Sequence, residues 1–383
     1  MAATATATSI DPAVLPLNPK LLTNLIARVS LAILGTLLCW VPLRVLGRNG
    51  EFAATVLIAT VCALNAITVI NSLTWRSDDW TQWPSGRGLC DLEVYLLVPL
   101  DTMYAAAVFA VVRRLAGQVR LSSGSSSSGQ QLPPAHSHAS LGAATVVVFT
   151  YFDLAQRFVV GTLVGCSAVY DNSLPKLLVF DVPPAAFAIA SVPYAYLTYT
   201  RYRKISNQTT AILGPANSPA TVRAHRTRRR LYLMCVAILT VYLPLQLFLA
   251  AMGIRDTVMT TTTKMAADTT GGGAESAAEA QPLQTYSFGR IHSEIAGSSP
   301  EHRYAWSAIL FIPSWLVPFY VMNQPYVAVL TAGVVFAFFG LGDEAKEMYK
   351  VHRRRDQYDI SDDNLDIDAA MPSKPGDSSR REQ

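Results

Sequence analysis

The chain has 383 residues, of which 51% are hydrophobic and 15% are charged, whereas soluble domains carry about 25% charged residues. This composition excludes an ordinary water-soluble domain as the main part of the protein. The net charge of +4 is small, so the positions of the basic residues carry more information than their sum.

Apolar stretches long enough to cross a bilayer recur along the chain, and each is bounded by Gly, Pro or charged residues. They predict an all-α membrane protein, a seven-transmembrane helix bundle over 22–341. The N-terminal segment 1–21 precedes it, and the tail 342–383 has too few apolar residues for a core and is predicted to be mostly disordered. The predicted helices cover about 22–43, 52–73, 90–112, 141–163, 177–199, 231–254 and 319–341.

The last apolar region, 304–341, is too long for one ordinary span and is interrupted by Pro313, Pro318 and Pro325. Two interpretations remain open. Either 304–318 is an outer segment folded onto the mouth of the bundle, or the whole region forms one long, kinked helix, because membrane helices tolerate proline kinks. We favour the outer segment, with the seventh helix at 319–341.

The basic residues predict the orientation. The linkers 113–140 and 200–230 contain basic residues and no acidic ones, whereas 74–89 and 255–304 mix both signs. Loops rich in Lys and Arg stay in the cytoplasm, which predicts an N-terminus outside and a cytoplasmic C-terminus. The basic edge sets the topology and contacts anionic lipid, or it also docks an acidic partner; we expect both roles, which charge by itself does not separate. Its candidate residues are Arg113, Arg114, Arg201, Arg203, Lys204, Arg226, Arg228, Arg229 and Arg230.

Polar side chains within the predicted spans are candidate functional residues, because charges are costly in a bilayer. Asp101, Asp153, Gln156, Arg157 and Asp181 gather toward the predicted outer half, where a ligand would enter. The alternative is that they only pair internally, for example Asp153 with Arg157 one helical turn later.

Cys90 opens the third predicted helix at the outer face, and Cys166 lies in the second outer loop. A disulfide between them is plausible in an oxidising compartment and would hold that loop over the bundle; the alternative is two free thiols. Cys39, Cys62 and Cys235 lie within predicted helices and are interpreted as packing residues.

Three tryptophans, Trp75, Trp80 and Trp83, lie in or beside the first outer loop. Tryptophan prefers the membrane interface, which alone explains them. The functional alternative is an apolar rim for a lipid-bearing or peptide ligand.

Motifs for other classes of protein are missing from the sequence. It contains no phosphate loop, no His-Glu-x-x-His motif, no nucleophile elbow and no Cys-x-x-Cys spacing, so we expect neither an enzyme nor a metal or cofactor site. A transporter or channel is the alternative class; a transporter would be expected to show internal repeats, and none is clear.

The chain resembles the fungal a-factor-type receptors for lipopeptide mating pheromones over roughly 22–350. The order of short patterns across the predicted helices carries the resemblance, and the chain departs from the family pattern in a Thr/Gly-rich insert at 260–280 and a Ser-rich second cytoplasmic loop. The patterns are Asn71 with Trp75; Gly88-Leu89-Cys90-Asp91; Arg113-Arg114-Leu115; Gln156-Arg157-Phe158; Gly165-Cys166; Leu243-Pro244-Leu245; Tyr286-Ser287; Ile291-His292; Trp306; Phe338-Phe339-Gly340-Leu341-Gly342; and Glu344-Ala345 with Tyr349.

The resemblance implies a plasma-membrane, G-protein-coupled receptor for a farnesylated peptide pheromone, with a heterotrimeric G protein and the mating response inside the cell. The prenyl chain is expected to enter through the bilayer or aromatic surface, with polar groups orienting the peptide. Membrane lipids are expected neighbours, a homodimer stays open, and no nucleic-acid partner is expected. The expected ligand-binding residues are Trp75, Asp101, Asp153, Gln156, Arg157, Asp181 and Trp306.

Pro244 in the sixth predicted helix is the expected activation pivot, because proline lacks the amide donor and weakens the local helix. Movement there would carry Arg226–Arg230 outward and open a cytoplasmic cleft. The basic edge would then contact the G protein.

Overall fold

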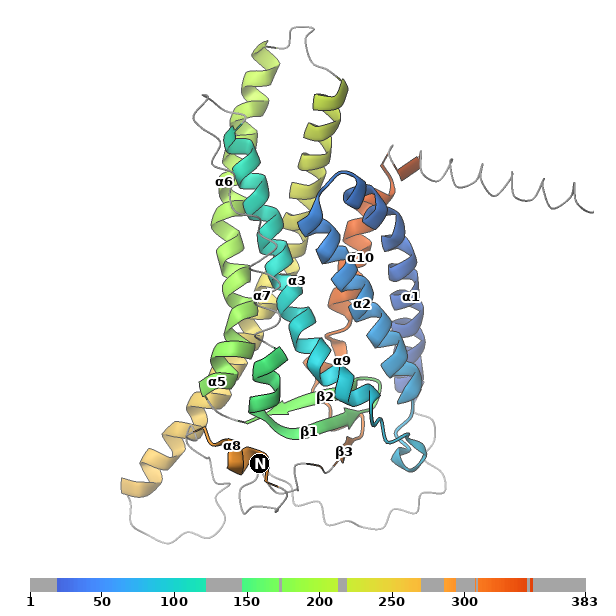
Figure 1. Cartoon of the computed structure of the whole chain (residues 1–383), viewed down its shortest axis with the longest axis vertical. Coiled ribbons are helices and arrows are strands. Elements are labelled where there is room, and N and C mark those ends of the chain that lie inside the picture. Colours follow the sequence, from blue (N-terminus) through green and yellow to red (C-terminus); the bar gives the residue numbers. More distant parts are fainter. Residues whose placement is uncertain are drawn as a thin grey trace, which may run out of the picture.

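The computed structural model describes residues 19–121, 147–171, 174–212, 219–269, 286–293, 307, 309–342 and 345–346. Long helices form a bundle, and a small sheet closes one end of it (Figure 1). The helices are α1 (Pro19–Arg48), α2 (Phe52–Thr74), α3 (Leu89–Leu121), α5 (Leu174–Lys176), α6 (Val182–Ile212), α7 (Pro219–Thr269), α8 (Phe288–Ile291), α9 (Phe319–Asn323) and α10 (Tyr326–Val335). A short 3-10 turn, η2 (Trp80–Gln82), and two π-helical segments, η3 (Leu177–Asp181) and η5 (Phe336–Gly340), complete the helical elements.

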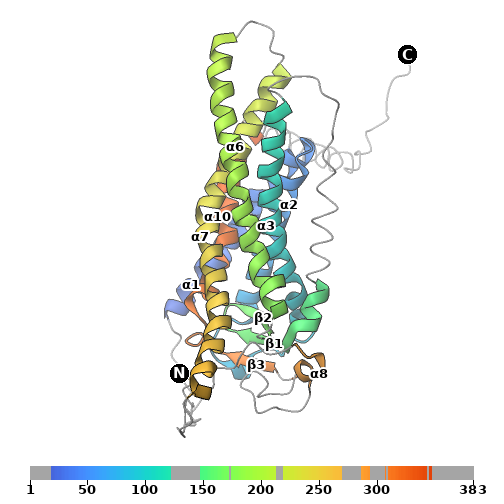
Figure 2. The same cartoon turned by 90° about the vertical axis from the view of Figure 1, so that its left-hand side faces the viewer.

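Among the described residues, six helices are long and apolar enough to cross a membrane. They correspond to six of the seven predicted helices, and the turned view shows them running side by side (Figure 2). Their hydrophobic segments span Pro19–Arg48, Phe52–Thr74, Leu89–Gly117, Leu177–Arg201, Arg226–Arg255 and Phe319–Gly340.

The fourth predicted helix, 141–163, is wrong over its second half. Residues 147–153 are helical, but β1 (Leu154–Gly161) then continues as a strand, and 141–146 lie outside the described residues. The stretch contains Phe158, Val159 and Val160, which suit a strand, and a tight turn follows it. Its backbone bonds are satisfied by other strands, which the hydrophobicity of one segment does not reveal.

The sheet has the order β2-β1-β3. β2 (Gly165–Tyr170) pairs antiparallel with β1, so that Val160 lies opposite Cys166. β3 (Ile309–Ile312) pairs in parallel with β1. The interval 304–318 therefore contains a strand folded onto the end of the bundle, and the helical part of the last span begins only at Phe319, which contradicts the long-helix alternative.

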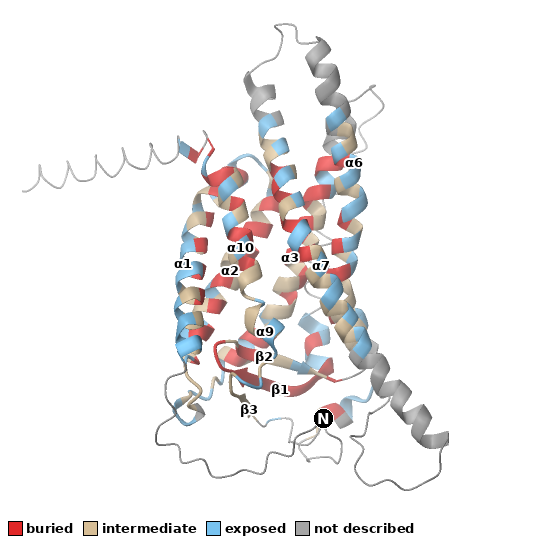
Figure 3. Ribbon diagram, turned by 180° about the vertical axis from the view of Figure 1, so that it is seen from behind, coloured by how far each residue is buried: buried red, intermediate tan, exposed pale blue. Residues whose placement is uncertain are grey.

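The main core lies between the long helices. It joins Leu46 of α1, Leu57 of α2, Leu115 of α3, Met234 of α7 and Val335 of α10. Large apolar side chains also cover the outward faces, and Figure 3 shows exposed residues there opposite the buried inner faces. Apolar outward faces fit a helix bundle surrounded by lipid. The exposed apolar side chains include Leu37, Tyr196 and Val241.

Candidate functional site

The turn between β1 and β2 is docked onto the end of α2. The Leu163 amide donates to the Trp75 carbonyl over 2.8 Å, and the Ser72 hydroxyl donates to the Leu163 carbonyl over 3.2 Å. The Asn71 side-chain amide donates to the Val164 carbonyl over 3.1 Å. Gly165 has a φ of 80° and packs so closely on Asn71 that a β-carbon would overlap that side chain, so this position requires glycine.

Arg28 fastens this turn to two membrane helices. Its side chain is fully buried on α1, and Nη1 donates to the Leu163 carbonyl over 2.8 Å. Nη2 donates to the Met322 carbonyl near the end of α9, and the guanidinium lies 5.8 Å from the centre of the Tyr326 ring. One planar group thus joins α1, the sheet and the last span.

Sequence reasoning missed Arg28, although a signal was present. It is a lone arginine inside the first apolar stretch, and a charge within a span is a candidate functional residue by default. Leu163, which accepts from Arg28, has a φ of 61°, a left-handed conformation that is uncommon for a side chain of this kind. The docking contacts hold that conformation in place.

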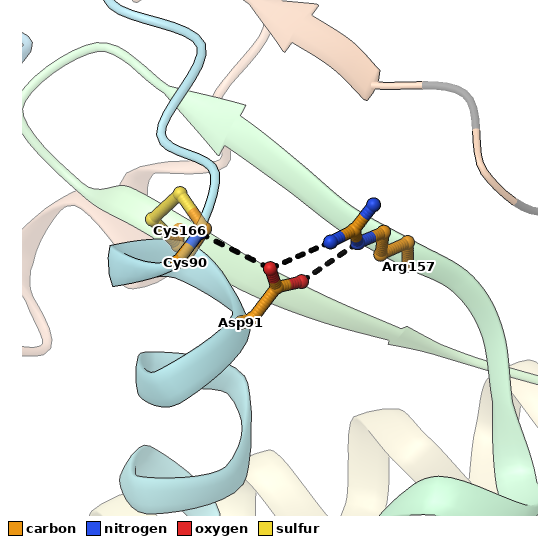
Figure 4. A network of polar contacts seen from close by, with 5 residues as sticks. Cys90, Asp91, Arg157 and Cys166 are labelled. Carbon is orange, nitrogen blue, oxygen red and sulfur yellow. Dashed lines mark hydrogen bonds and ion pairs between the residues drawn. A yellow bond between two sulfur atoms is a disulfide. The ribbon is translucent and has the colours of Figure 1, made fainter.

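A disulfide and an ion pair attach the sheet to α3 (Figure 4). Cys90 and Cys166 form the disulfide, joining the same two cysteines that the sequence suggested. Arg157 Nε donates to Asp91 Oδ1 and its Nη2 donates to Oδ2, each over 2.7 Å, which is the bidentate arrangement. This hydrogen-bonded carboxylate raises the pKa of Arg157. The Asp153–Arg157 pairing considered from the sequence is wrong, because Arg157 lies on a strand and points to α3.

Asp78 ties the loop between α2 and α3 to the hairpin turn and to the segment after β3. Its Oδ1 accepts from the Thr162 hydroxyl and from the Ser314 amide, each over 2.7 Å, and its Oδ2 accepts from the Ser314 hydroxyl over 2.7 Å. Asp78 lies between α2 and α3, Thr162 in the hairpin turn and Ser314 just after β3. Three connections far apart in sequence therefore meet at one carboxylate. Together we call β1, β2, their turn and β3 the outer cap.

Trp75 is not the exposed rim residue that one interpretation of the sequence expected. Its side chain is fully buried in a second cluster with the disulfide, Phe158 and Val160. Trp83 is half-buried, donating to the Ser77 carbonyl over 2.8 Å, and the side chain of Trp80 lies outside the described residues. In this conformation Trp75 supports the outer cap and has no surface to offer a ligand.

The other expected ligand-binding residues fall into separate places. Asp153 and Gln156 are buried at the start of the outer cap, and Trp306 lies outside the described residues. Leu154 pairs with Tyr170 at the end of β2, and the Tyr170 ring stacks on Phe180 with centroids 4.2 Å apart, so the adjacent residues Asp153 and Asp181 both lie near this end. Burial, reinforced by the charges of these two acids, raises the pKa of the Tyr170 phenol.

Asp101 lies away from that group, on α3, where it accepts from Gln324 in the last span over 3.1 Å. One turn further along α3, the Tyr104 hydroxyl is 2.8 Å from that of Thr331, and its ring lies 4.8 Å from the ring of Tyr242. This set of contacts joins α3, α7 and α10 in the core. Pro244 lies two residues beyond Tyr242, on an outward face of α7.

At the opposite end, several of the expected basic residues fasten helix ends. Arg114 lies 3.6 Å from Glu51 and donates to the Gly50 carbonyl over 3.2 Å, and Arg201 donates to the Ala116 carbonyl over 2.7 Å. The guanidinium of Arg230 packs on Gly342. The side chain of Lys204 lies outside the described residues, Arg201, Arg228 and Arg230 are half-buried, and Arg113, Arg114, Arg203, Arg226 and Arg229 are exposed.

Comparison with known proteins decides between the classes left open by the sequence. A family model described as pheromone A receptor, STE3, matches residues 27–267 and 257–355. The chain belongs to the pheromone A receptor family. The matched residues include most of the bundle and the outer cap. No curated protein matches the chain in a direct comparison.

Family membership makes this chain a pheromone receptor and a multi-pass membrane protein. The family is one of receptors and not of enzymes. Within the described part of the receptor, the outer cap and the Asp101–Tyr104 region are two places where polar side chains join elements far apart in the sequence. They are the candidate parts for recognising the pheromone and for passing the signal into the bundle.

Proposed function

We propose that this receptor lies in the plasma membrane, binds a lipidated, farnesylated peptide mating pheromone and activates a heterotrimeric G protein and the mating response. The family match over most of the chain is the observation that carries the proposal. The outer cap would face the cell exterior, because a disulfide belongs in an oxidising compartment. The arginine-rich helix ends would face the cytoplasm.

The connections between the described elements support seven crossings. α3 begins at the outer cap and runs to the far end of the bundle, whereas β1 starts back at the cap (Figure 1). We infer a further crossing between α3 and β1, where the sequence predicts the fourth helix. Added to the six described spans, it would give seven crossings, an N-terminus outside and a C-terminus inside.

The contacts suggest how a ligand would change the helix packing. Pheromone bound at the outer cap would shift the hairpin turn, and Arg28 would pass that shift to the last span through the Met322 carbonyl. Thr331 of the last span contacts Tyr104, which in turn packs on Tyr242 of α7. A ligand that favours one of two such packings would shift the population of receptors toward it.

The G protein would dock where α7 and its neighbours end. Arg113, Arg203, Arg226 and Arg229 are exposed near that end and are the basic side chains proposed to contact an acidic partner. Pro244 in α7 removes one backbone hydrogen bond and is the proposed pivot for moving this end.

The test is a signalling assay in a mating strain that lacks its own receptor. The full chain is expressed, lipidated and unlipidated mating peptides are applied, and a G-protein reporter is read. We expect a response to at least one lipidated peptide, with the unlipidated form much weaker. Surface expression with no response to any lipidated mating peptide would overturn the proposal.

Pro244→Leu tests the pivot in the same assay. Because Pro244 faces outward, we expect surface expression to stay within about twofold of wild type, since surface changes are usually within about 0.5 kcal/mol. Basal or ligand-driven reporter activity should change. Unchanged signalling at equal expression would remove the pivot.

A further inference from the structure

An open groove lies between α1 and the last span, on the side of the bundle near the outer cap. Its volume is about 480 Å³, within the range of about 300–1,000 Å³ typical of small-molecule sites. Most of its wall is apolar. It is lined by Pro19, Lys20, Thr23, Asn24, Ala27, Asn323 and Tyr326.

The two walls of the groove follow from helix geometry. Lys20, Thr23 and Ala27 recur at intervals of three and four residues, so they form one stripe along α1. On the other wall, Phe319 lies one turn before Asn323 on α9 and shares its face. Phe319 is 84% exposed, so a large aromatic side chain stands beside the groove without being packed into the core.

The outer cap favours a sideways route into the receptor. Its turn is buried on the bundle, with Thr162, Leu163 and Cys166 each at most 1% exposed. A ligand approaching from above therefore meets docked backbone and a disulfide. The groove instead opens between two helices whose neighbouring side chains, such as Ile26, point outward to lipid. A chain dissolved in the outer leaflet reaches this opening without crossing the cap.

The groove also contacts the residues that fasten the cap. The Tyr326 hydroxyl donates to Asn24 Oδ1 over 2.8 Å, and both side chains line the groove. The face of Tyr326 lies near Arg28, which holds the Leu163 carbonyl. An occupant that moves Tyr326 would therefore disturb the contact between the cap and the last span.

We propose that this groove binds the prenyl chain of the lipidated pheromone, entering from the outer leaflet. The proposal rests on the proposed function, which supplies the lipidated ligand and places this end of the bundle outside. The open, mostly apolar space between two helices has room for one branched hydrocarbon chain. The polar groups at its edge, on Lys20, Asn24 and Asn323, would face the peptide end of the ligand.

The first test uses photolabelling of the full chain in nanodiscs. The probe is N-acetyl-S-farnesyl-cysteine with a diazirine in the farnesyl chain, and the competitor is the same compound without the diazirine. We expect saturable labelling of peptides from 19–28 and 319–327. Saturable labelling elsewhere, or labelling that excess competitor does not reduce, would overturn the proposal.

A pair of variants separates the groove from the neighbouring lipid surface. Ala27→Phe fills the groove, whereas Ile26→Phe adds bulk to the adjacent outward face of α1. Excluding two or three methylene groups from a buried site corresponds to about tenfold or more in affinity. We expect Ala27→Phe to lower probe affinity at least about tenfold and Ile26→Phe to leave it unchanged. Equal effects from the two variants would overturn the proposal.

The photolabelling experiment also tests two other occupants of the groove, bulk lipid and the chain that precedes α1. A photoactivatable phosphatidylcholine that labels the same peptides and competes with the farnesyl probe would assign the groove to bulk lipid and overturn the proposal. Deletion of residues 2–17 that raises probe labelling several-fold would assign the groove to the preceding chain and also overturn it. Unchanged labelling after both tests supports the prenyl site.

The signalling assay distinguishes failure of the groove from failure of the proposed function. The proposed function fails if wild-type receptor does not respond to any lipidated mating peptide. The groove assignment fails if wild type responds and Ala27→Phe retains the same preference for lipidated over unlipidated peptide. Loss of that preference in Ala27→Phe but not in Ile26→Phe, at equal surface expression, supports the prenyl site.

Discussion

The two ends of the described bundle are built differently. At the end with the outer cap, which we propose faces the cell exterior, a disulfide, a bidentate ion pair and the hydrogen bonds of Arg28 and Asp78 join elements far apart in the sequence. At the opposite end, proposed to face the cytoplasm, the described contacts are between helices, such as Arg201 with the Ala116 carbonyl. The first end is therefore cross-linked, whereas the second is held by contacts that helix movement can break. This difference suits a receptor that recognises its ligand with a preformed surface and signals by opening the other end.

The largest effect is expected from breaking the disulfide. Cys90 and Cys166 are separated by 76 residues, and closing a loop of this size stabilises a fold by about 4 kcal/mol in the chain-entropy description. We expect Cys90→Ser and Cys166→Ser to lower surface expression and detergent-extracted Tm equally. The double variant should be no worse than either single one.

Cys39→Ser is the matched control, because that thiol is buried in the bundle away from the outer cap. Cys39→Ser should leave the contacts of the outer cap intact, even if it weakens the packing of the core between the long helices. Additive losses from Cys90→Ser and Cys166→Ser would show that the two cysteines act independently and would contradict a shared bond.

A smaller loss of stability is expected from replacing Arg28 with a side chain that does not bond to both carbonyls at once. Lysine keeps the charge but lacks the planar fork, so Arg28→Lys should lose one of the two carbonyl contacts, about 1.5–3 kcal/mol for a charged hydrogen bond. We expect a lower Tm together with changed basal signalling, because the last span is released from the cap.

Ser72→Ala is the control for Arg28→Lys. It removes a hydrogen bond to the same Leu163 carbonyl, about 1 kcal/mol, but the Ser72 hydroxyl, unlike Arg28, does not bond to the Met322 carbonyl of the last span. It should lower Tm slightly and leave basal signalling unchanged. Equal changes in basal signalling from the two variants would contradict the role of Arg28 in coupling the cap to the last span.

The ion pair of the cap is expected to contribute less, because both side chains are about one-third exposed, 32% for Arg157 and 33% for Asp91. Water weakens such pairs to about 1 kcal/mol or less. We expect a double-mutant cycle of Arg157→Gln and Asp91→Asn to give a coupling energy in that range that falls with added salt. A coupling energy that salt does not change would mean that the pair is more enclosed than its exposure indicates.

The smallest effect on stability is expected at the inner end. Arg203 is exposed, so Arg203→Gln should change the free energy of unfolding by no more than about 0.5 kcal/mol, with little change in Tm, while lowering the G-protein reporter response. Arg201→Gln should lower Tm slightly, because it removes the bond to Ala116. If Arg203→Gln lowered Tm and left the G-protein response unchanged, the proposed difference between the two ends would be wrong.

The helical part of the fold could be predicted because membrane spans satisfy their own backbone hydrogen bonds. A run of apolar residues such as 52–73 is therefore sufficient to predict α2, observed at Phe52–Thr74. The same reasoning failed at 154–163. There the backbone bonds depend on β2 and on β3, which lies about 150 residues away in the chain.

The candidate site was predicted only in part, for a related reason. Arg157 was identified as a costly charge, but its partner was assigned from helical spacing, which does not apply on a strand. Trp75 was expected among the ligand-binding residues, as part of an apolar rim in one of two interpretations, yet packing around the disulfide buries it. Arg28 was passed over, although its charge within an apolar stretch should have singled it out.

The sequence by itself determined that this chain belongs in a membrane, since the number and length of its apolar segments depend only on residue types along the chain. Its short patterns also indicated the receptor family that the comparison then established. Only the tertiary structure decided how the outer end is closed and which charges meet there. Those contacts depend on the relative positions of segments far apart in sequence, and local residue preferences contain no information about those positions.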